Sequence, residues 1–324
     1  MFRRGRRLRD TAIIRDLVRE NELSVKDFIL PIFVVEGENI KREISSLKGN
    51  YHWSVDRLGE LVKELKETGV RSVIIFGVPE HKDCKGTEAY NENGIVQKAI
   101  RKLRELDDEL YIITDVCMCE YTNHGHCGIL HGKSIDNDET LEYLGKIALS
   151  HAKAGANMIA PSDMMDGRIG YIRKVLDDNG FKMTPIMSYA AKYASGFYGP
   201  FREAAGSAPQ FGDRKGYQMD PANSREAMLE IEADINEGAD IIMVKPAMSY
   251  LDIVREARNR YDVPLCVYNV SGEYAMVKNA GEAGLIDEKR VALEMLISMK
   301  RAGAKMIMTY YALEAARWLK EDNN

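Results

Sequence analysis

The sequence predicts a (β/α)8 barrel. Short apolar runs of strand length recur along the chain, and four of them follow an amphipathic segment that ends in a glycine. Glycine is favoured just past the end of a helix, so the pattern describes a helix, a turn and a buried parallel strand. Eight such runs match the eight strands of a barrel. A doubly wound open sheet is the alternative, but no G-x-G-x-x-G turn follows any of the runs.

The expected strands occur at regular intervals through the chain. They cover residues 28–35, 72–78, 111–117, 158–160, 185–188, 241–244, 265–270 and 306–309. The glycines expected to end the preceding helices are Gly69, Gly155, Gly238 and Gly303.

Composition narrows the class of protein. A chain of 324 residues with 45% hydrophobic content can bury a large core, and it has no apolar run of 18 residues. A cytoplasmic location is therefore the default expectation. The net charge of −5 argues against a general nucleic-acid binder, although five of the first nine residues are arginines, which suit a solvated or partner-docking segment. Five cysteines in a chain of this length do not make a disulfide scaffold.

The run 240–246 ends in a single lysine, Lys245, followed by Pro246. Proline cannot donate to a sheet ladder, so we expect the strand to stop there and to place Lys245 at its C-terminal end. Desolvation or a second cation lowers a lysine pKa until the neutral amine can attack a carbonyl. A salt-bridged or snorkelling lysine is the alternative for an isolated residue.

Polar residues stand at the C-terminal ends of several other expected strands. If the chain forms a barrel, these residues converge on one mouth. They are Asp115, Cys117, Cys119, Ser162, Asp163, Tyr189, Lys192, Asn269, Ser271, Thr309 and Tyr310. If Lys192 and Lys245 lie near one mouth, each would lower the pKa of the other, which prepares an amine for imine chemistry at neutral pH.

Cys117, Cys119 and Cys127 lie within eleven residues, with His124, His126 and His131 close by. Zinc binds thiolate and imidazole, and three protein ligands with one open position form a catalytic zinc site. Buried free cysteines or a redox pair are the alternatives.

Residues 190–221 show little apolar periodicity and combine bases with aromatic residues. Loops of this length are uncommon unless they are functional, so we expect a lid whose arginines bind substrate carboxylates. A solvated surface excursion explains the bases but not the aromatic residues. The candidates are Tyr198, Phe201, Arg202, Arg214 and Gln218.

The chain resembles the porphobilinogen synthase (5-aminolevulinate dehydratase) family from residue 28 to Tyr311. Residues 243–247 (MVKPA) are similar to the Schiff-base signature of that family, and residues 188–192 (SYAAK) with 197–202 (FYGPFR) to its second-lysine segment. Residues 160–168 (APSDMMDGR) and 268–274 (YNVSGEY) match two further family motifs.

The resemblance implies a (β/α)8 barrel with an N-terminal arm, residues 1–27 making subunit contacts and residues 28–324 forming the catalytic domain. It implies condensation of two 5-aminolevulinate molecules to porphobilinogen, with loss of two waters, in tetrapyrrole biosynthesis. Lys245 would form an imine with the substrate that supplies the propionate side, and Lys192 with the substrate that supplies the acetate side. The implied binding groups are Ser271 and Tyr310 for the first carboxylate, and Arg202, Arg214 and Gln218 for the second. Asp115, Ser162 and Asp163 are candidate proton carriers or orienting groups.

The resemblance also suggests cofactors and partners. Because all three cysteines are present, we expect zinc at Cys117, Cys119 and Cys127. Many bacterial members bind an allosteric magnesium through a glutamate that matches Glu230, although a solvated surface glutamate is the alternative. The family forms a homo-octamer in which the arm wraps a neighbouring subunit.

Two other functions remain open from the sequence. A Schiff-base aldolase on the same barrel shares Lys245 but leaves the cysteines and Lys192 unexplained. A non-enzymatic zinc scaffold needs a closed site, with one of the three histidines as fourth ligand.

Overall fold

A computed structural model of the chain describes residues 2–322. Its centre is a parallel sheet in the order β8-β5-β4-β1-β12-β11-β10-β9. Its strands are β1 (Phe28–Val35), β4 (Ser72–Val78), β5 (Tyr111–Val116), β8 (Met158–Pro161), β9 (Met187–Lys192), β10 (Ile241–Lys245), β11 (Leu265–Asn269) and β12 (Met306–Thr309). A parallel bridge between Ile159 and Ile186 links the two ends of this order, so the sheet closes into the predicted barrel.

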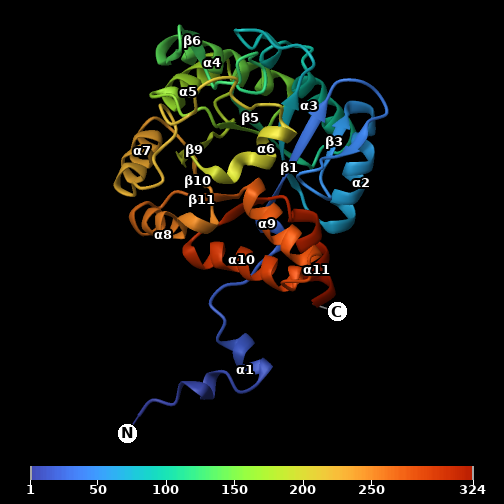
Figure 1. The fold of residues 1–324 in the computed structure, drawn as a ribbon, viewed down its shortest axis with the longest axis vertical. Coiled ribbons are helices and arrows are strands. Elements are labelled where there is room, and N and C mark those ends of the chain that lie inside the picture. The colour runs from blue at the N-terminus through green and yellow to red at the C-terminus, as the bar shows by residue number, and fades with distance from the viewer. Residues whose placement is uncertain (1, 323–324) are drawn as a thin grey trace.

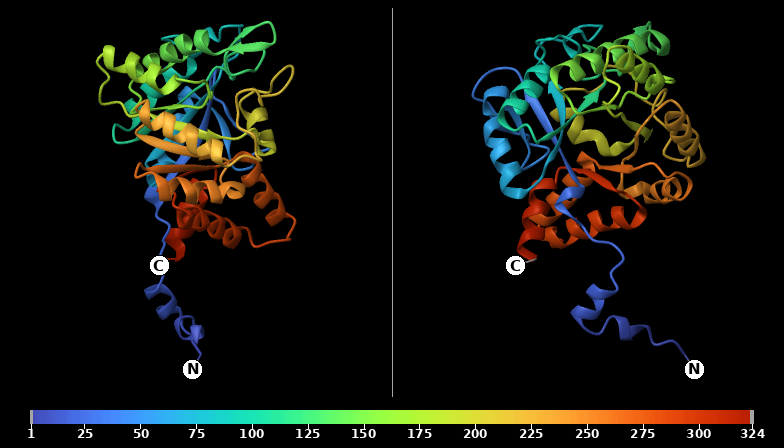
Figure 2. Two further views of the ribbon diagram at one scale, coloured as in Figure 1. Left: turned by 90° about the vertical axis from the view of Figure 1, so that its left-hand side faces the viewer. Right: turned by 180° about the vertical axis from the view of Figure 1, so that it is seen from behind.

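Helices cover the outside of the barrel (Figures 1 and 2). They are α2 (Leu58–Thr68), α3 (Ile95–Leu106), α4 (Asn137–Ala154), α5 (Arg168–Asp178), α7 (Arg225–Asn236), α8 (Leu251–Arg260), α9 (Ser271–Glu282), α10 (Glu288–Ala302) and α11 (Ala312–Asp322). The strands are apolar and almost wholly buried because each is covered by helices outside and by other strands' side chains inside. Gly69, Gly155, Gly238 and Gly303 all have positive φ just past helix ends, as the sequence predicts.

β1, β4 and β12 have the predicted bounds and four other strands differ by one residue at the C-terminal end, but the fifth predicted strand is displaced. The prediction placed it at residues 185–188, whereas β9 begins at Met187 and continues to Lys192. Residues 189–192 therefore belong to the barrel wall, and Ala190, Ala191 and Lys192 are not part of the expected lid. β10 ends at Lys245, directly before Pro246, as predicted.

Smaller elements lie in the connections that follow the strands, and the sequence patterns did not predict them. They are β2 (Lys41–Glu43), β3 (Tyr51–Ser54), β6 (Ile129–His131), β7 (Ser134–Asp136), η3 (Val55–Arg57), η4 (Thr87–Ala89), η5 (Gly196–Tyr198), α6 (Gly199–Ala204) and η6 (Met248–Tyr250). The expected lid therefore contains the short helices η5 and α6.

The residues before β1 extend away from the barrel (Figure 1). They form η1 (Gly5–Leu8), α1 (Ala12–Leu17) and η2 (Val25–Asp27). Ile13 and Leu17 of α1 are about three-quarters exposed, at 74% and 76%. In the described chain, no helix is long and apolar enough to cross a membrane.

Candidate active site

Two lysines end neighbouring strands of the barrel. Lys192 is the last residue of β9 and Lys245 the last of β10, and the two residues are partners in the strand register. Both side chains are buried, with 4% and 5% of their surface exposed. Because parallel strands end at the same side of a barrel, the two amines share one site.

The Lys245 amine lies among aromatic rings. It is 4.3 Å from the ring centre of Tyr268, 5.1 Å from those of Tyr189 and Phe201, and 5.2 Å from that of Tyr198. Burial, and then the charge of Lys192, lowers the pKa of Lys245 to about 7, although Asp115 opposes this. A large fraction of this lysine is therefore a neutral nucleophile at neutral pH.

Asp115 and Ser162 lie beside the lysines. Ser162 Oγ donates to Asp115 Oδ2 at 3.1 Å, and Lys192 Nζ donates to the Ser162 carbonyl. Burial, and then the charge of Glu120, raises the pKa of Asp115 to about 8, although Lys192 and Lys245 oppose this. The site thus holds a carboxyl group and an amine that both titrate near neutrality, which suits proton transfer.

Asp163 has different partners. Its Oδ1 accepts from the Met165 amide at 2.8 Å, and its Oδ2 lies 3.7 Å from Arg168 Nε. Arg168 is paired in turn with Asp234 through two bonds of 3.1 Å. Burial raises the pKa of Asp163 to about 6, although Arg168 opposes this. These contacts favour an orienting role for Asp163 over proton transfer.

The three predicted cysteines meet in space. The sulfur atoms of Cys117, Cys119 and Cys127 all lie within 4.8 Å of one another, and all three residues are buried. Hydrogen bonds from Cys117 and Cys119 hold the pKa of Cys127 well below its usual range. Three converging buried thiols, one of them favouring the thiolate, fit a soft metal ion such as zinc.

The nearby histidines do not join the sulfur group within that distance in the described residues. His126 contacts Tyr217 Oη at 3.2 Å and the Phe211 carbonyl at 3.0 Å through its two ring nitrogens. His124 Nδ1 accepts from the His126 amide. His131 lies on the exposed side, 2.7 Å from Glu139. The site therefore lacks the histidine ligand that a closed scaffold site requires.

Of the predicted carboxylate-binding groups of the lid, Arg214 and Gln218 are buried and Arg202 is half-buried, and all three are partly unpaired. Arg214 Nη2 donates to the carbonyls of Gly125 and Ser207. In the described chain, Nε of Arg202, Nε of Arg214 and both amide atoms of Gln218 are buried without a hydrogen-bond partner. Buried donors without a partner are costly, and a bound carboxylate would satisfy them.

The other predicted binding groups surround Lys245. Ser271 Oγ accepts from the Phe201 amide at 3.0 Å, and Tyr310 Oη lies 2.9 Å from Tyr268 Oη. Tyr198 Oη donates to the carbonyl of Lys245 itself at 3.3 Å. The neighbouring Tyr311 instead packs against Tyr274, with ring centres 4.4 Å apart. Tyr310 is therefore the tyrosine that belongs to the Lys245 site.

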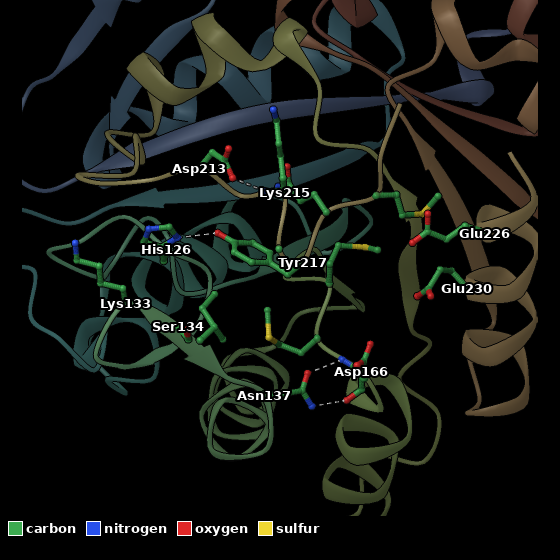
Figure 3. Close-up of a pocket in the computed structure, with 16 residues that line it drawn as sticks. His126, Lys133, Ser134, Asn137, Asp166, Asp213, Lys215, Tyr217, Glu226 and Glu230 are labelled. Carbon is green, nitrogen blue, oxygen red and sulfur yellow. Dashed lines mark hydrogen bonds between the residues drawn. The ribbon is translucent and has the colours of Figure 1, made fainter. Parts of the chain in front are cut away.

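Glu230 lies at a separate pocket of about 500 Å3 (Figure 3). Figure 3 shows Glu226 and Glu230 on α7 at one side of the pocket with Asp166 close to Glu230, and His126 and Lys133 on the opposite side. Glu230 is half-buried, and burial raises its pKa although Arg168 opposes this. Gln218 lines the same pocket, so the pocket adjoins the lid. Neither Lys192 nor Lys245 lines it.

Several functional neighbours had no role in the sequence analysis. Glu120 is only 2% exposed and lies 3.1 Å from the Cys119 sulfur. Its position next to a predicted metal ligand was the available signal. Tyr268 is the first residue of the family motif 268–274 but had no role assigned to it, and Asp234 gave no signal, because an aspartate in a helix is usual in a barrel.

Comparisons with known proteins agree with this geometry. The family model described as delta-aminolevulinic acid dehydratase matches residues 2–318. The delta-aminolevulinic acid dehydratase of Bacillus subtilis is 55% identical over 320 residues, covering 99% of each chain. That of Staphylococcus aureus is 53% identical, covering 98% of this chain and 99% of the relative.

A solved structure is also similar. It is delta-aminolevulinic acid dehydratase (porphobilinogen synthase) from Toxoplasma gondii in complex with the reaction product porphobilinogen. It is 43% identical with a TM-score of 0.97, covering 99% of this chain and 93% of that one. This chain therefore belongs to the delta-aminolevulinic acid dehydratase family.

Proposed function

We propose that Lys245 and Lys192 each form a Schiff base in the reaction of this enzyme, which condenses two 5-aminolevulinate molecules to porphobilinogen. The single observation that carries the proposal is the register pairing of two buried lysines at adjacent strand ends. One imine is enough for an aldolase, whereas two paired amines suit a reaction that joins two keto acids.

The neutral Lys245 amine attacks the ketone carbon of one substrate, and water leaves as the imine forms. The imine makes that carbon electrophilic and its neighbouring C–H acidic, so carbon–carbon and carbon–nitrogen bonds form without a strong base. Each lysine leaves as a free amine as the product forms, so the two waters released in imine formation are the two waters lost overall. Lys245 holds the substrate that supplies the propionate side of the product, and Lys192 the one that supplies the acetate side. Asp115, hydrogen-bonded to Ser162, exchanges protons with these groups, and Asp163 orients its neighbours.

The substrate carboxylates bind at two places. Ser271 and Tyr310 hold the carboxylate of the first substrate, beside Lys245. Arg202, Arg214 and Gln218 hold that of the second, and their unpaired buried atoms support this assignment. Tyr198 and Phe201, whose ring centres lie 5.2 and 5.1 Å from the Lys245 amine, line the site of the first substrate.

Cys117, Cys119 and Cys127 hold a zinc ion, which supplies Lewis acidity near the second substrate. The converging buried sulfurs support this choice of metal. Glu230, with Glu226 and Asp166 nearby, provides the hard oxygen ligands that magnesium prefers, and we assign an allosteric magnesium to this pocket.

We further propose that residues 1–27 form an arm for subunit contacts in a homo-octamer and that residues 28–324 form the catalytic domain. The exposed apolar side chains of α1 support a docking role for the arm. We place the enzyme in the cytoplasm, without a nucleic-acid or membrane partner.

The test measures porphobilinogen formation from 5-aminolevulinate by wild type, Lys192→Met and Lys245→Met. We expect each substitution to lower the rate by at least about 1,000-fold, because it removes a nucleophile. Lys174→Met, which removes an exposed lysine from α5, is the matched control and should retain wild-type activity. Retained activity in folded Lys245→Met would reject the proposal.

A further inference from the structure

The segment after α6 lies against the loop that carries the cysteines. We call residues 204–218 the lid segment. His124 O accepts from the Gln210 amide at 3.0 Å, and His126 Nε2 contacts the Phe211 carbonyl at 3.0 Å. Arg214 of the segment donates to the Gly125 carbonyl at 2.9 Å. The lid segment is therefore docked on the cysteine loop mainly through backbone carbonyls.

One further contact comes from a different part of the chain. Lys82 lies in the connection between β4 and α3, and its Nζ donates to the Gly206 carbonyl at 2.7 Å. Gly206 has a φ of +56°, and a Cβ at this position would lie 3.3 Å from Nζ. The next carbonyl in the chain, that of Ser207, accepts from Arg214. Cationic side chains thus bind two consecutive carbonyls at the start of the lid segment.

The environment of Lys82 also joins the lid to the cysteine loop. Its ammonium group is half-buried, which lowers the pKa of Lys82, and the charge of Glu120 opposes this shift. Burying part of an ammonium group costs free energy unless hydrogen bonds and opposite charges compensate for it. The Gly206 carbonyl and Glu120 supply this compensation, so the Lys82 side chain is fixed at the junction of three segments.

We propose that Lys82 is a positioning residue that holds the lid segment in place, so that Arg214 and Gln218 stay at the carboxylate of the second substrate. The inference rests on the proposed roles of those two residues. Lys82 does not contact the reacting atoms, and it acts through the Gly206 carbonyl.

The loss of this contact should weaken substrate binding more than chemistry. Lys82→Met keeps the length of the side chain but removes its donor. A charge-assisted hydrogen bond to a carbonyl is among the stronger ones, so the lid segment should open at least about tenfold more often. Apparent affinity falls in proportion to the population of the closed state, so KM should rise, by as much as about tenfold where the substrate-free lid segment is mostly open, while kcat changes less than about threefold. Lys82→Arg keeps a cationic donor and should restore both.

The experiment is hydrogen–deuterium exchange of the zinc-loaded, substrate-free enzyme, followed in peptides that cover residues 204–218, with KM and kcat measured in parallel. Lys320→Met is the matched control, because Lys320 Nζ also donates to a backbone carbonyl, that of Glu67, far from the lid. We expect the lid peptides to exchange faster in Lys82→Met than in wild type, Lys82→Arg or Lys320→Met. The zinc content should be the same in all four proteins. Lys82→Ala, which also removes the donor, replaces Lys82→Met if the latter does not fold.

Unchanged lid exchange in the folded variant would overturn the proposal. Faster exchange that Lys82→Arg does not reverse would also overturn it, because it would show an effect of packing and not of the donor. The exchange is measured without substrate, so its outcome is independent of whether Lys245 forms a Schiff base.

Discussion

Two features of its surroundings lower the pKa of Lys245, to which we assign the nucleophilic role. Burial at a strand end and the charge of Lys192 favour the neutral amine, and the surrounding aromatic rings replace water around it. Asp115 opposes the shift and keeps the pKa near neutrality instead of far below it. Burial, Lys192 and Asp115 together thus set the protonation state of the Lys245 amine.

This arrangement predicts a pH dependence. With a Lys245 pKa of about 7, the neutral amine increases from about 10% to about 90% of the enzyme between pH 6 and pH 8. The initial rate of 5-aminolevulinate adduct formation, trapped with cyanoborohydride and measured by mass spectrometry, should rise about ninefold over this range.

Lys192→Met tests the direction in which the charge of Lys192 shifts the pKa of Lys245. It removes a cation that lowers the Lys245 pKa, so the midpoint of the adduct profile should move to higher pH. A midpoint that moves to lower pH, or a flat profile in wild type, would contradict this electrostatic account.

The loop that carries Cys117, Cys119 and Cys127 is the element that we propose binds the metal. Cys119→Ala removes one of three converging sulfurs and should lower zinc affinity at least about 100-fold, because two ligands hold zinc poorly. Zinc content after dialysis, measured by atomic emission, checks this. Cys266→Ala is the control: Cys266 is also buried and free but lies in β11 outside the sulfur group, so its zinc content should match wild type. Equal zinc in both variants would exclude the cysteine site.

Helices α5 and α7 are joined to β9 by a buried charge network. Arg168 at the start of α5 binds Asp234 of α7, Ser188 Oγ and the Tyr189 carbonyl. Asp234→Ala leaves the Arg168 charge without its main partner and should lower the free energy of unfolding by about 3–5 kcal/mol.

Denaturant unfolding measures this effect, and an exposed pair supplies the comparison. Asp178→Ala breaks the Lys174–Asp178 pair, whose side chains are 74% and 60% exposed, and should change stability by less than about 1 kcal/mol. A loss of similar size in both variants would mean that the buried network has no special role in holding β9.

At the scale of the whole molecule, the N-terminal residues extend from the barrel and present apolar side chains to solvent. Ile13 and Leu17 are four residues apart on α1, so they share one face of the helix. Ile13→Glu with Leu17→Glu should dissociate the proposed octamer into smaller assemblies, as measured by analytical ultracentrifugation. Arg15→Gln, a polar change on the same helix, should leave the assembly intact. An octamer that survives both glutamates would remove α1 from the interface.

The barrel was predictable because its signals are local. Apolar runs, helix-ending glycines and Pro246 fix strand positions without knowledge of distant contacts, and the polar strand ends then indicate the mouth. The convergence of Cys117, Cys119 and Cys127 followed from their spacing. The fifth strand was placed wrongly because Tyr189 to Lys192 have a mixed polarity that hides their burial in the closed barrel.

Other features depend on tertiary contacts that no local pattern reports. The Lys82–Gly206 bond joins residues 124 positions apart, and the Arg168–Asp234 pair joins residues 66 positions apart. Single-sequence patterns assign such charged residues to solvent-exposed faces, so their burial emerges only from the folded chain. The separation of Glu230 from the lysine site is likewise a property of the packed helices.

The most direct test of the central claim is intact-protein mass spectrometry after incubation with 5-aminolevulinate and borohydride, on wild type, Lys192→Ala and Lys245→Ala. We expect adducts on both lysines of wild type, located by peptide mapping, of which folded Lys245→Ala keeps only the one on Lys192 and folded Lys192→Ala only the one on Lys245. An adduct that persists in Lys245→Ala at wild-type yield, or no adduct on active wild type, would contradict the role assigned to Lys245.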